Sequence, residues 1–154
     1  NNLKTIADLK NVKGLKLGAN PEFKTRSYGI PGLEKVYGIT GIEFTSLSDG
    51  GGPATLKALL DGKVDVADIY STTPSIVENK LVTLEDPENL IASQNVLPLI
   101  NEKKANDKVE DVLDAISAQL TTQDLLDLNG KNQGDDKTAP DVLAKQWLTS
   151  KGLI

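Results

Sequence analysis

The sequence predicts an α/β fold, in which strands and helices alternate, followed by a helical C-terminal segment. Three short β-branched or alternating runs, over residues 15–19, 42–46 and 64–70, have the length and pattern of strands. Each is followed by a loop and then by a proline that suits the first turn of a helix. From Asp107 onward, apolar residues recur at helical spacing instead. Repeated strand, loop and helix units predict a mostly parallel sheet over residues 1–97, with strand 64–70 at its centre.

Residues 62–74 carry the strongest sequence signal for a ligand-binding edge. Their apolar run ends in Tyr70, Ser71 and Thr72, and Pro74 then suits the start of a helix. In open α/β sheets, ligands bind at the carboxyl ends of the strands, where the following helix directs its free N–H groups. The stretch therefore predicts the ligand-facing edge of a cleft. A capped helix with a buried tyrosine would explain the same residues.

The remaining elements before residue 100 follow from local signals. We expect a short helix over residues 3–9 capped by Thr5, a helical turn at Asn20–Pro21, helices over 33–37, 54–60 and 75–80, and a strand over 81–84. The apolar run 94–100 contains Pro98, which has no N–H to donate, so we expect an edge strand or a connection there.

Two loops carry further candidate side chains. Arg26 and Tyr28 lie in a segment rich in breakers, where an arginine could bind a carboxylate and a tyrosine ring a cation. A surface ion pair and a packing ring are the alternative. The Gly-rich turn 49–53 precedes a helix, but it lacks the Lys-Ser/Thr ending of a phosphate-binding loop. We therefore expect a close approach of a ligand or of another segment at this turn.

Three amphipathic helices are predicted after residue 107. The first carries apolar residues from Val109 to Leu120, the second is capped by Thr121 or Thr122 and ends at Asn129-Gly130, and the third begins at Pro140. Trp147 could contact a ligand, but its helical spacing from Leu143 favours a core position. Asp135 and Asp136 are interpreted as solvated charges without a metal.

Composition excludes several classes of function. The 154 residues carry a formal net charge of −5, which argues against nucleic acid or an anionic membrane as the main partner. The chain contains no Cys and no His, so a thiol nucleophile, a zinc-finger spacing and the commonest general base are absent. No cofactor or metal is expected. No apolar run approaches the length of a membrane span, and the lack of Met suggests a processed or excised chain.

Several separate stretches, in matching order, resemble one family: the glycine betaine, choline and osmoprotectant substrate-binding proteins of ABC importers. The matching residues are Thr5-Ile6-Ala7-Asp8-Leu9, Glu22-Phe23 with Arg26, Gly29-Ile30-Pro31-Gly32-Leu33-Glu34-Lys35-Val36-Tyr37-Gly38, Ala58-Leu59, Gly62-Lys63-Val64-Asp65-Val66, Tyr70-Ser71-Thr72, Leu84-Glu85-Asp86, Leu128-Asn129 and the region 144–154.

The resemblance implies a type II periplasmic-binding-protein fold, whose two α/β lobes close on a solute. Residues 1–97 resemble the second, ligand-binding lobe of that fold, and residues 98–154 resemble the helical segment that returns to the first lobe. The N-terminal half of the first lobe has no counterpart here. We therefore expect a half-site that is completed by a first lobe or by a homo-oligomer.

The resemblance also implies roles for the candidate residues. In this family, aromatic side chains hold a quaternary ammonium group by cation–π attraction. Tyr70 is the matching ring, Arg26 the partner of a carboxylate, and Ser71 and Thr72 possible donors. The chain departs from the family at two positions: Tyr28 replaces an acid, and Leu56 replaces a tyrosine. A cage with one ring fewer would bind more weakly or prefer another solute, unless Tyr28 compensates.

The function implied is that of a non-enzymatic receptor that delivers an osmoprotectant to an ABC permease from outside the cytoplasm, either in the periplasm or anchored by lipid. The alternative is an effector-sensing domain of a transcription regulator, which would require a basic helix-turn-helix before Asn1. An enzyme would depend on Asp65, Asp68 or Ser71, and the sequence contains no arrangement that would activate them.

Overall fold

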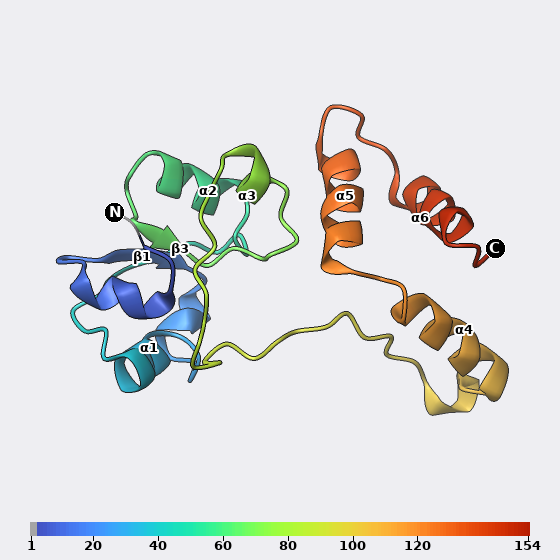
Figure 1. The fold of residues 1–154 in the computed structure, drawn as a ribbon, viewed down its shortest axis with the longest axis horizontal. Coiled ribbons are helices and arrows are strands. Elements are labelled where there is room, and N and C mark those ends of the chain that lie inside the picture. The colour runs from blue at the N-terminus through green and yellow to red at the C-terminus, as the bar shows by residue number, and fades with distance from the viewer. Residues whose placement is uncertain (1–2) are drawn as a thin grey trace. The chain divides into compact units, whose positions relative to one another are not determined.

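The computed structural model describes residues 3–154, which divide into two compact units (Figure 1). The first unit contains residues 3–70 and Ser75–Ala92. The second contains Ser71–Pro74 and Ser93–Ile154. The first unit holds the sheet, and the second is helical.

The elements of the first unit alternate as the sequence predicts. In chain order they are 3₁₀ helix η1 (Ile6–Asn11), strand β1 (Lys16–Ala19), 3₁₀ helix η2 (Pro21–Lys24), helix α1 (Ile30–Tyr37), strand β2 (Glu43–Ser46), helix α2 (Pro53–Leu60), strand β3 (Val66–Ala67) and helix α3 (Ser75–Glu78). Thr5 caps η1 in a capping box with Asp8, and Gly38, at φ 65°, ends α1.

The sheet is parallel throughout its described strands, and its order is β2-β1-β3. Leu17 of β1 is opposite Phe44 on one side and Val66 on the other. The prediction that strand 64–70 is central is therefore wrong: β1 is central, and β3 has only two residues. Local apolarity identifies a strand, whereas its place in a sheet depends on where each crossover returns the chain.

The predicted strand over residues 81–84 is also not formed. The chain there is extended, and one parallel bridge joins Thr5 to Glu85. Its two backbone hydrogen bonds, from Ile6 N–H to Glu85 O and from Glu85 N–H to Lys4 O, both measure 2.9 Å. Val82 is 72% exposed, so this apolar run lacks the packing that would extend the pairing.

The core of the first unit lies between the sheet and the helical turns of its N-terminal half. Its buried cluster consists of Ile6, Leu9, Leu15, Leu17, Ala19, Phe23, Leu33, Tyr37 and Ile39. The phenol of Tyr37 donates a hydrogen bond to the Asp86 carboxylate and accepts one from the Glu88 N–H at 3.0 Å. This polar contact attaches the segment after the Thr5–Glu85 bridge to α1.

The second unit contains 3₁₀ helix η3 (Glu102–Lys104) and helices α4 (Asp107–Ser117), α5 (Thr122–Gln133) and α6 (Pro140–Ser150). Helix α5 continues past its predicted end at Asn129-Gly130 as far as Gln133. A glycine inside a helix costs only about 1 kcal/mol relative to alanine, which the rest of the helix can offset. No helix within residues 3–154 combines the length and apolarity needed to cross a membrane.

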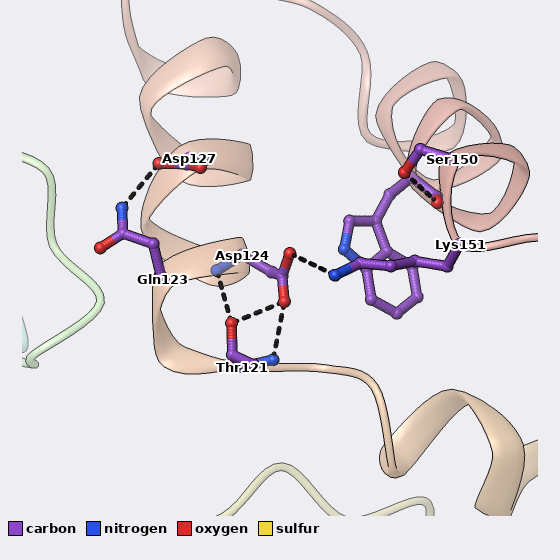
Figure 2. A network of polar contacts seen from close by, with 7 residues as sticks. Thr121, Gln123, Asp124, Asp127, Ser150 and Lys151 are labelled. Carbon is purple, nitrogen blue, oxygen red and sulfur yellow. Dashed lines mark hydrogen bonds and ion pairs between the residues drawn. The ribbon is translucent and has the colours of Figure 1, made fainter.

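A polar network joins α5 to the end of α6 (Figure 2). Thr121 and Asp124 form a capping box at the start of α5, and Lys151 Nζ lies 3.2 Å from the Asp124 carboxylate. These contacts, led by the Thr121 hydroxyl, hold the pKa of Asp124 well below its usual value. Trp147 is half-buried rather than fully buried, and the Lys151 ammonium lies 5.5 Å from its ring centroid.

Candidate functional site

Loops from all three parallel strands meet at one end of the sheet. They contain Asn20 after β1, residues 49–52 after β2, and residues 68–70 after β3. We call these residues the carboxyl edge. The Gly50 N–H donates to Asn20 Oδ1 at 3.2 Å, which ties the first loop to the second. Asn20 is predicted from the sequence only as part of a helical turn and not as a site residue, although an Asn-Pro pair directly after a strand is a usable signal.

Gly51 brings the second loop against the third. A Cβ atom at Gly51 would lie 2.8 Å from the Cα of Ile69 and 2.9 Å from the carbonyl oxygen of Asp68. Its φ of +76° is also one that side chains with a Cβ rarely adopt. The close approach expected at the Gly-rich turn is therefore made by the backbone that leads to Tyr70.

Tyr70 stands open at this edge. Its side chain is 62% exposed, and a Cβ atom at Gly50 would lie 4.0 Å from its Cε2 atom. The alternative of a buried tyrosine is therefore wrong. A glycine neighbour leaves the ring accessible to a ligand.

The Asp49 carboxylate caps the N-terminus of α2, the helix that follows the loop of residues 49–52. Its carboxylate accepts hydrogen bonds from the N–H groups of Ala54 at 2.7 Å and Thr55 at 3.1 Å, and from the Thr55 hydroxyl. The hydroxyl of the fully buried Thr55 is the main cause of a lowered pKa of Asp49. A carboxylate already occupies the N-terminus of α2, so this turn does not offer the phosphate site that was considered.

Arg26 lies on the loop after η2, which itself follows the central strand. The backbone of this loop is fixed, since the Arg26 N–H donates to Glu22 O and the Gly29 N–H donates to Arg26 O, both at 2.9 Å. The Arg26 side chain is exposed, and in residues 3–154 it joins no ion pair within 4.0 Å. The ion-pair alternative is not observed. No polar contact of the described residues links Arg26 to Tyr70, so their action on one ligand stays a prediction.

Tyr28 packs within its own loop. Its ring meets Phe23 edge-on, with centroids 6.1 Å apart and an angle of 74° between the planes. Phe23 is buried, whereas Tyr28 is 38% exposed. Tyr28 therefore fits the alternative of a packing ring, and one part of its side chain remains accessible to solvent.

Ser71 and Thr72 belong to the second unit. The carbonyl oxygen of Thr72 accepts a hydrogen bond from Asn129 Nδ2 at 3.0 Å, which joins this short segment to α5. The Ser71 side chain is exposed and that of Thr72 is half-buried. Their role as donors to a ligand stays a prediction.

Asp68 is the one carboxylate of the carboxyl edge without a hydrogen bond to its side chain among the described residues. It keeps a solvent-exposed surface, yet the protein around it displaces enough water to raise the pKa of its carboxyl. No group of three or more potential metal ligands occurs within residues 3–154. The chemistry of this edge is thus that of an aromatic ring and one partly desolvated carboxylate, and the Arg26 loop adds a guanidinium without an ion pair among the described residues.

The parallel sheet and the helices that follow its strands define a lobe of the periplasmic-binding-protein fold. The chain matches the family described as the substrate binding domain of the ABC-type glycine betaine transport system over residues 1–150. The match covers nearly the whole chain. The protein therefore belongs to this family.

Individual relatives agree with the family. The chain is 28% identical over 162 aligned positions to the glycine betaine-binding protein YehZ of Escherichia coli (strain K12), covering 99% of this chain and 53% of YehZ. The crystal structure of a glycine betaine/carnitine/choline ABC transporter superposes with a TM-score of 0.72 at 25% identity, over 98% of this chain and 55% of that one. Apo YehZ from Escherichia coli gives a TM-score of 0.62 at 25% identity, over 100% and 58%. The chain thus spans about half the length of these relatives.

Proposed function

We propose that this chain is the substrate-binding component, or part of it, of an ABC importer for glycine betaine, choline or a related osmoprotectant. The observation that carries the proposal is the exposed ring of Tyr70 beside Gly50 at the carboxyl edge. The family match supports a transport role, and no comparison favours the transcription-regulator alternative.

In the proposed site, two kinds of protein group bind different parts of the solute. Tyr70 attracts the quaternary ammonium through its π face, which contributes up to about 2 kcal/mol when the contact is desolvated. Arg26 pairs with the carboxylate of a betaine or carnitine, and choline has none. Ser71 and Thr72 donate hydrogen bonds, and the exposed part of Tyr28 supplies a second ring.

The remaining parts of the proposal concern the whole protein. Residues 1–97 act as the ligand-binding lobe, and residues 98–154 return toward a first lobe. The receptor delivers its solute to an ABC permease from outside the cytoplasm, in the periplasm or with a lipid anchor, and performs no catalysis. A lobe alone contacts its solute from one side, so we expect weak affinity for the 154-residue chain.

A ligand titration followed by NMR tests the proposal, because chemical shifts report weak binding. Glycine betaine, carnitine and choline should each shift the signals of residues 49–52 and 68–70, whereas glycine, which lacks the methyl groups, should not. Tyr70→Ala should weaken all three by roughly 1 to 2 kcal/mol, and Tyr70→Phe, which keeps the ring, should retain most of the affinity. Arg26→Gln should weaken glycine betaine and carnitine but spare choline.

Two outcomes would contradict this division of roles. Unchanged affinity in Tyr70→Ala would remove the ring from the site. Equal losses for choline and glycine betaine in Arg26→Gln would show that the guanidinium supports the fold of its loop and does not pair with a carboxylate.

A further inference from the structure

Asn20 lies at the carboxyl edge, where it follows the central strand β1 and directly precedes η2. Asparagine in this place commonly turns its side-chain oxygen to the free N–H groups of its own helix. The Asn20 side chain makes no such bond to η2. Its Oδ1 atom accepts instead from the Gly50 N–H at 3.2 Å, 30 positions further along the chain. The side chain therefore reaches across to the neighbouring loop.

The bond to Gly50 determines which end of the Asn20 amide is open to a ligand. A backbone N–H group only donates, so the atom that faces it is the amide oxygen, and the NH2 group is the other end. Among the described residues, Asn20 Nδ2 has no hydrogen-bond partner. It is not buried either, since Trp147 Nε1 is the one buried side-chain nitrogen or oxygen in that part of the chain without a partner. Asn20 thus offers two N–H donors to solvent.

Gly50 connects this amide to the ring of Tyr70. Its N–H holds Asn20, and a Cβ atom on it would lie 4.0 Å from Tyr70 Cε2, which is van der Waals contact. All three residues belong to the first unit. One glycine therefore separates the amide from the ring, and both side chains can contact the same small solute.

The Asn20 amide is held in place before any ligand arrives. Immobilising a mobile side chain on binding costs conformational entropy, and a group that is already fixed avoids this cost. The backbone of Asn20 continues directly from β1, and its side chain is fixed by the bond to Gly50. Tying the two loops together uses only the amide oxygen. The NH2 group is left for another partner.

We infer that the Asn20 amide is a solute-binding group that donates to the carboxylate of a betaine whose ammonium group lies on Tyr70. The inference rests on the proposed function, to which it adds a specificity-determining residue. A quaternary ammonium group has no N–H or O–H, so the carboxylate is the part of glycine betaine that a donor selects. The NH2 group is a donor only, which suits it to a carboxylate and not to a cation. Asn20 therefore favours a betaine over a cation that lacks a carboxylate.

Replacing the amide with a carboxylate separates the two roles of Asn20. Asn20→Asp keeps an oxygen for the Gly50 N–H, but it removes both donors and adds a negative charge. In an NMR titration of the 154-residue chain, we expect it to weaken glycine betaine binding about tenfold or more, because a hydrogen bond to a charged group is lost. Tetramethylammonium, which has the methyl groups and no carboxylate, should bind at least as tightly as it does to the parent chain.

Ser48→Asp is the matched control for charge. It places a carboxylate at an exposed position two residues before Gly50 and leaves Asn20 intact. It should weaken glycine betaine binding by less than about threefold, since solvent screens an exposed charge. The temperature coefficient of the Gly50 amide shift checks that Asn20→Asp keeps the bond between the two loops.

Two results would overturn the inference and leave the proposed function standing. One is a similar loss of glycine betaine affinity in Asn20→Asp and Ser48→Asp. The other is an equal loss for glycine betaine and tetramethylammonium in Asn20→Asp, which would give Asn20 a structural role only. If the parent chain binds neither compound, the proposed function fails together with the inference.

Discussion

Gly51 is the residue on which the close packing of the carboxyl edge depends most directly. A Cβ atom there would meet the backbone of Asp68 and Ile69, and backbone cannot swing aside as the end of a flexible side chain can. The position of Tyr70 follows from this contact, because the ring comes one residue after Ile69. The backbone that leads to the proposed binding side chain is thus packed against a residue that has no side chain.

Gly51→Ala should lower the free energy of unfolding more than a matched substitution at Gly62. Both glycines have similar positive φ, +76° and +69°, but nothing lies within 4 Å of a Cβ at Gly62. The left-handed backbone alone costs about 1–2 kcal/mol, and overpacking adds typically 1–3 kcal/mol at Gly51 only. Chemical denaturation measures the difference. Equal losses of unfolding free energy in the two variants would mean that the backbone near Gly51 can move to accommodate a Cβ atom.

Asp49 gives the carboxyl edge a dependence on pH. Hydrogen bonds favour its charged form, so its pKa is lower in the folded chain than in the unfolded one. Such a group stabilises the fold above its unfolded pKa, near 3.9, and this contribution disappears as the pH falls through the lower, folded value.

Asp49→Ala should therefore cost about 0.5–2 kcal/mol of unfolding free energy at neutral pH, as helix-capping losses do. The difference from the parent chain should shrink in acid. Ser48→Ala, at a neighbouring exposed side chain without a hydrogen bond among the described residues, is the control and should cost little at any pH. A loss at Asp49 that is the same in acid and at neutral pH would point to packing and not to charge.

At the scale of elements, α1 and the segment 85–91 are joined by the Tyr37 phenol. Burial is the main cause of a raised pKa of Tyr37, and its hydrogen bond to Asp86 adds to the effect. A neutral phenol can donate to the Asp86 carboxylate and accept from the Glu88 N–H at once, so it binds this segment at two positions. Gly32 supports the same contact, because a Cβ there would lie 2.5 Å from the side chain of Leu90.

Tyr37→Phe should cost about 1–3 kcal/mol of unfolding free energy, since it leaves a partly buried donor and a carboxylate oxygen without their partner. Amide exchange in residues 85–91 should accelerate, while exchange in β1 should follow only the global loss. Tyr28→Phe serves as the stability control, because its hydroxyl makes no hydrogen bond among the described residues. Equal destabilisation by the two variants would show that the phenol contact contributes nothing.

At the scale of the whole molecule, the buried apolar residues are distributed unevenly between the two units. Within the described chain, all but one of the buried apolar residues lie in the first unit, and Leu143 is the exception. Helices α4 and α5 have no buried residue, although α4 is amphipathic. Local stability follows buried apolar area, so the second unit has little of its own.

Amide hydrogen exchange should therefore separate the units in the isolated chain. We expect the amides of α4 to exchange through frequent local opening, and those of β1 only through global unfolding. The hydrogen bonds of α4 and β1 are both regular, so the difference reports packing and not secondary structure. Equal protection of the two elements would show that α4 is covered in solution, by self-association or otherwise.

Local patterns in the sequence correctly predict most of the elements. Strands and helices are identified by apolar spacing with a period of 2 or 3.6 residues. Helix starts are marked by Pro31, Pro53 and Pro140 and by the capping residues Thr5 and Thr121. These signals are readable because they act between near neighbours in the sequence. The order of these elements predicts a mostly parallel α/β lobe, which the strand pairing confirms. The resemblance of separate stretches to one family is confirmed by the family match.

Only the tertiary structure determines the contacts between residues that are distant in the sequence. The sequence does not indicate that β1 is central, that Asn20 accepts from Gly50, or that Tyr37 meets Asp86 across 49 positions. These depend on the return path of each crossover and on close packing, which no short window of sequence contains. The exposure of the Tyr70 ring is also decided by the tertiary structure, because the same apolar run would suit a buried ring. The glycine next to the ring, Gly50, lies in a loop 20 residues earlier in the chain.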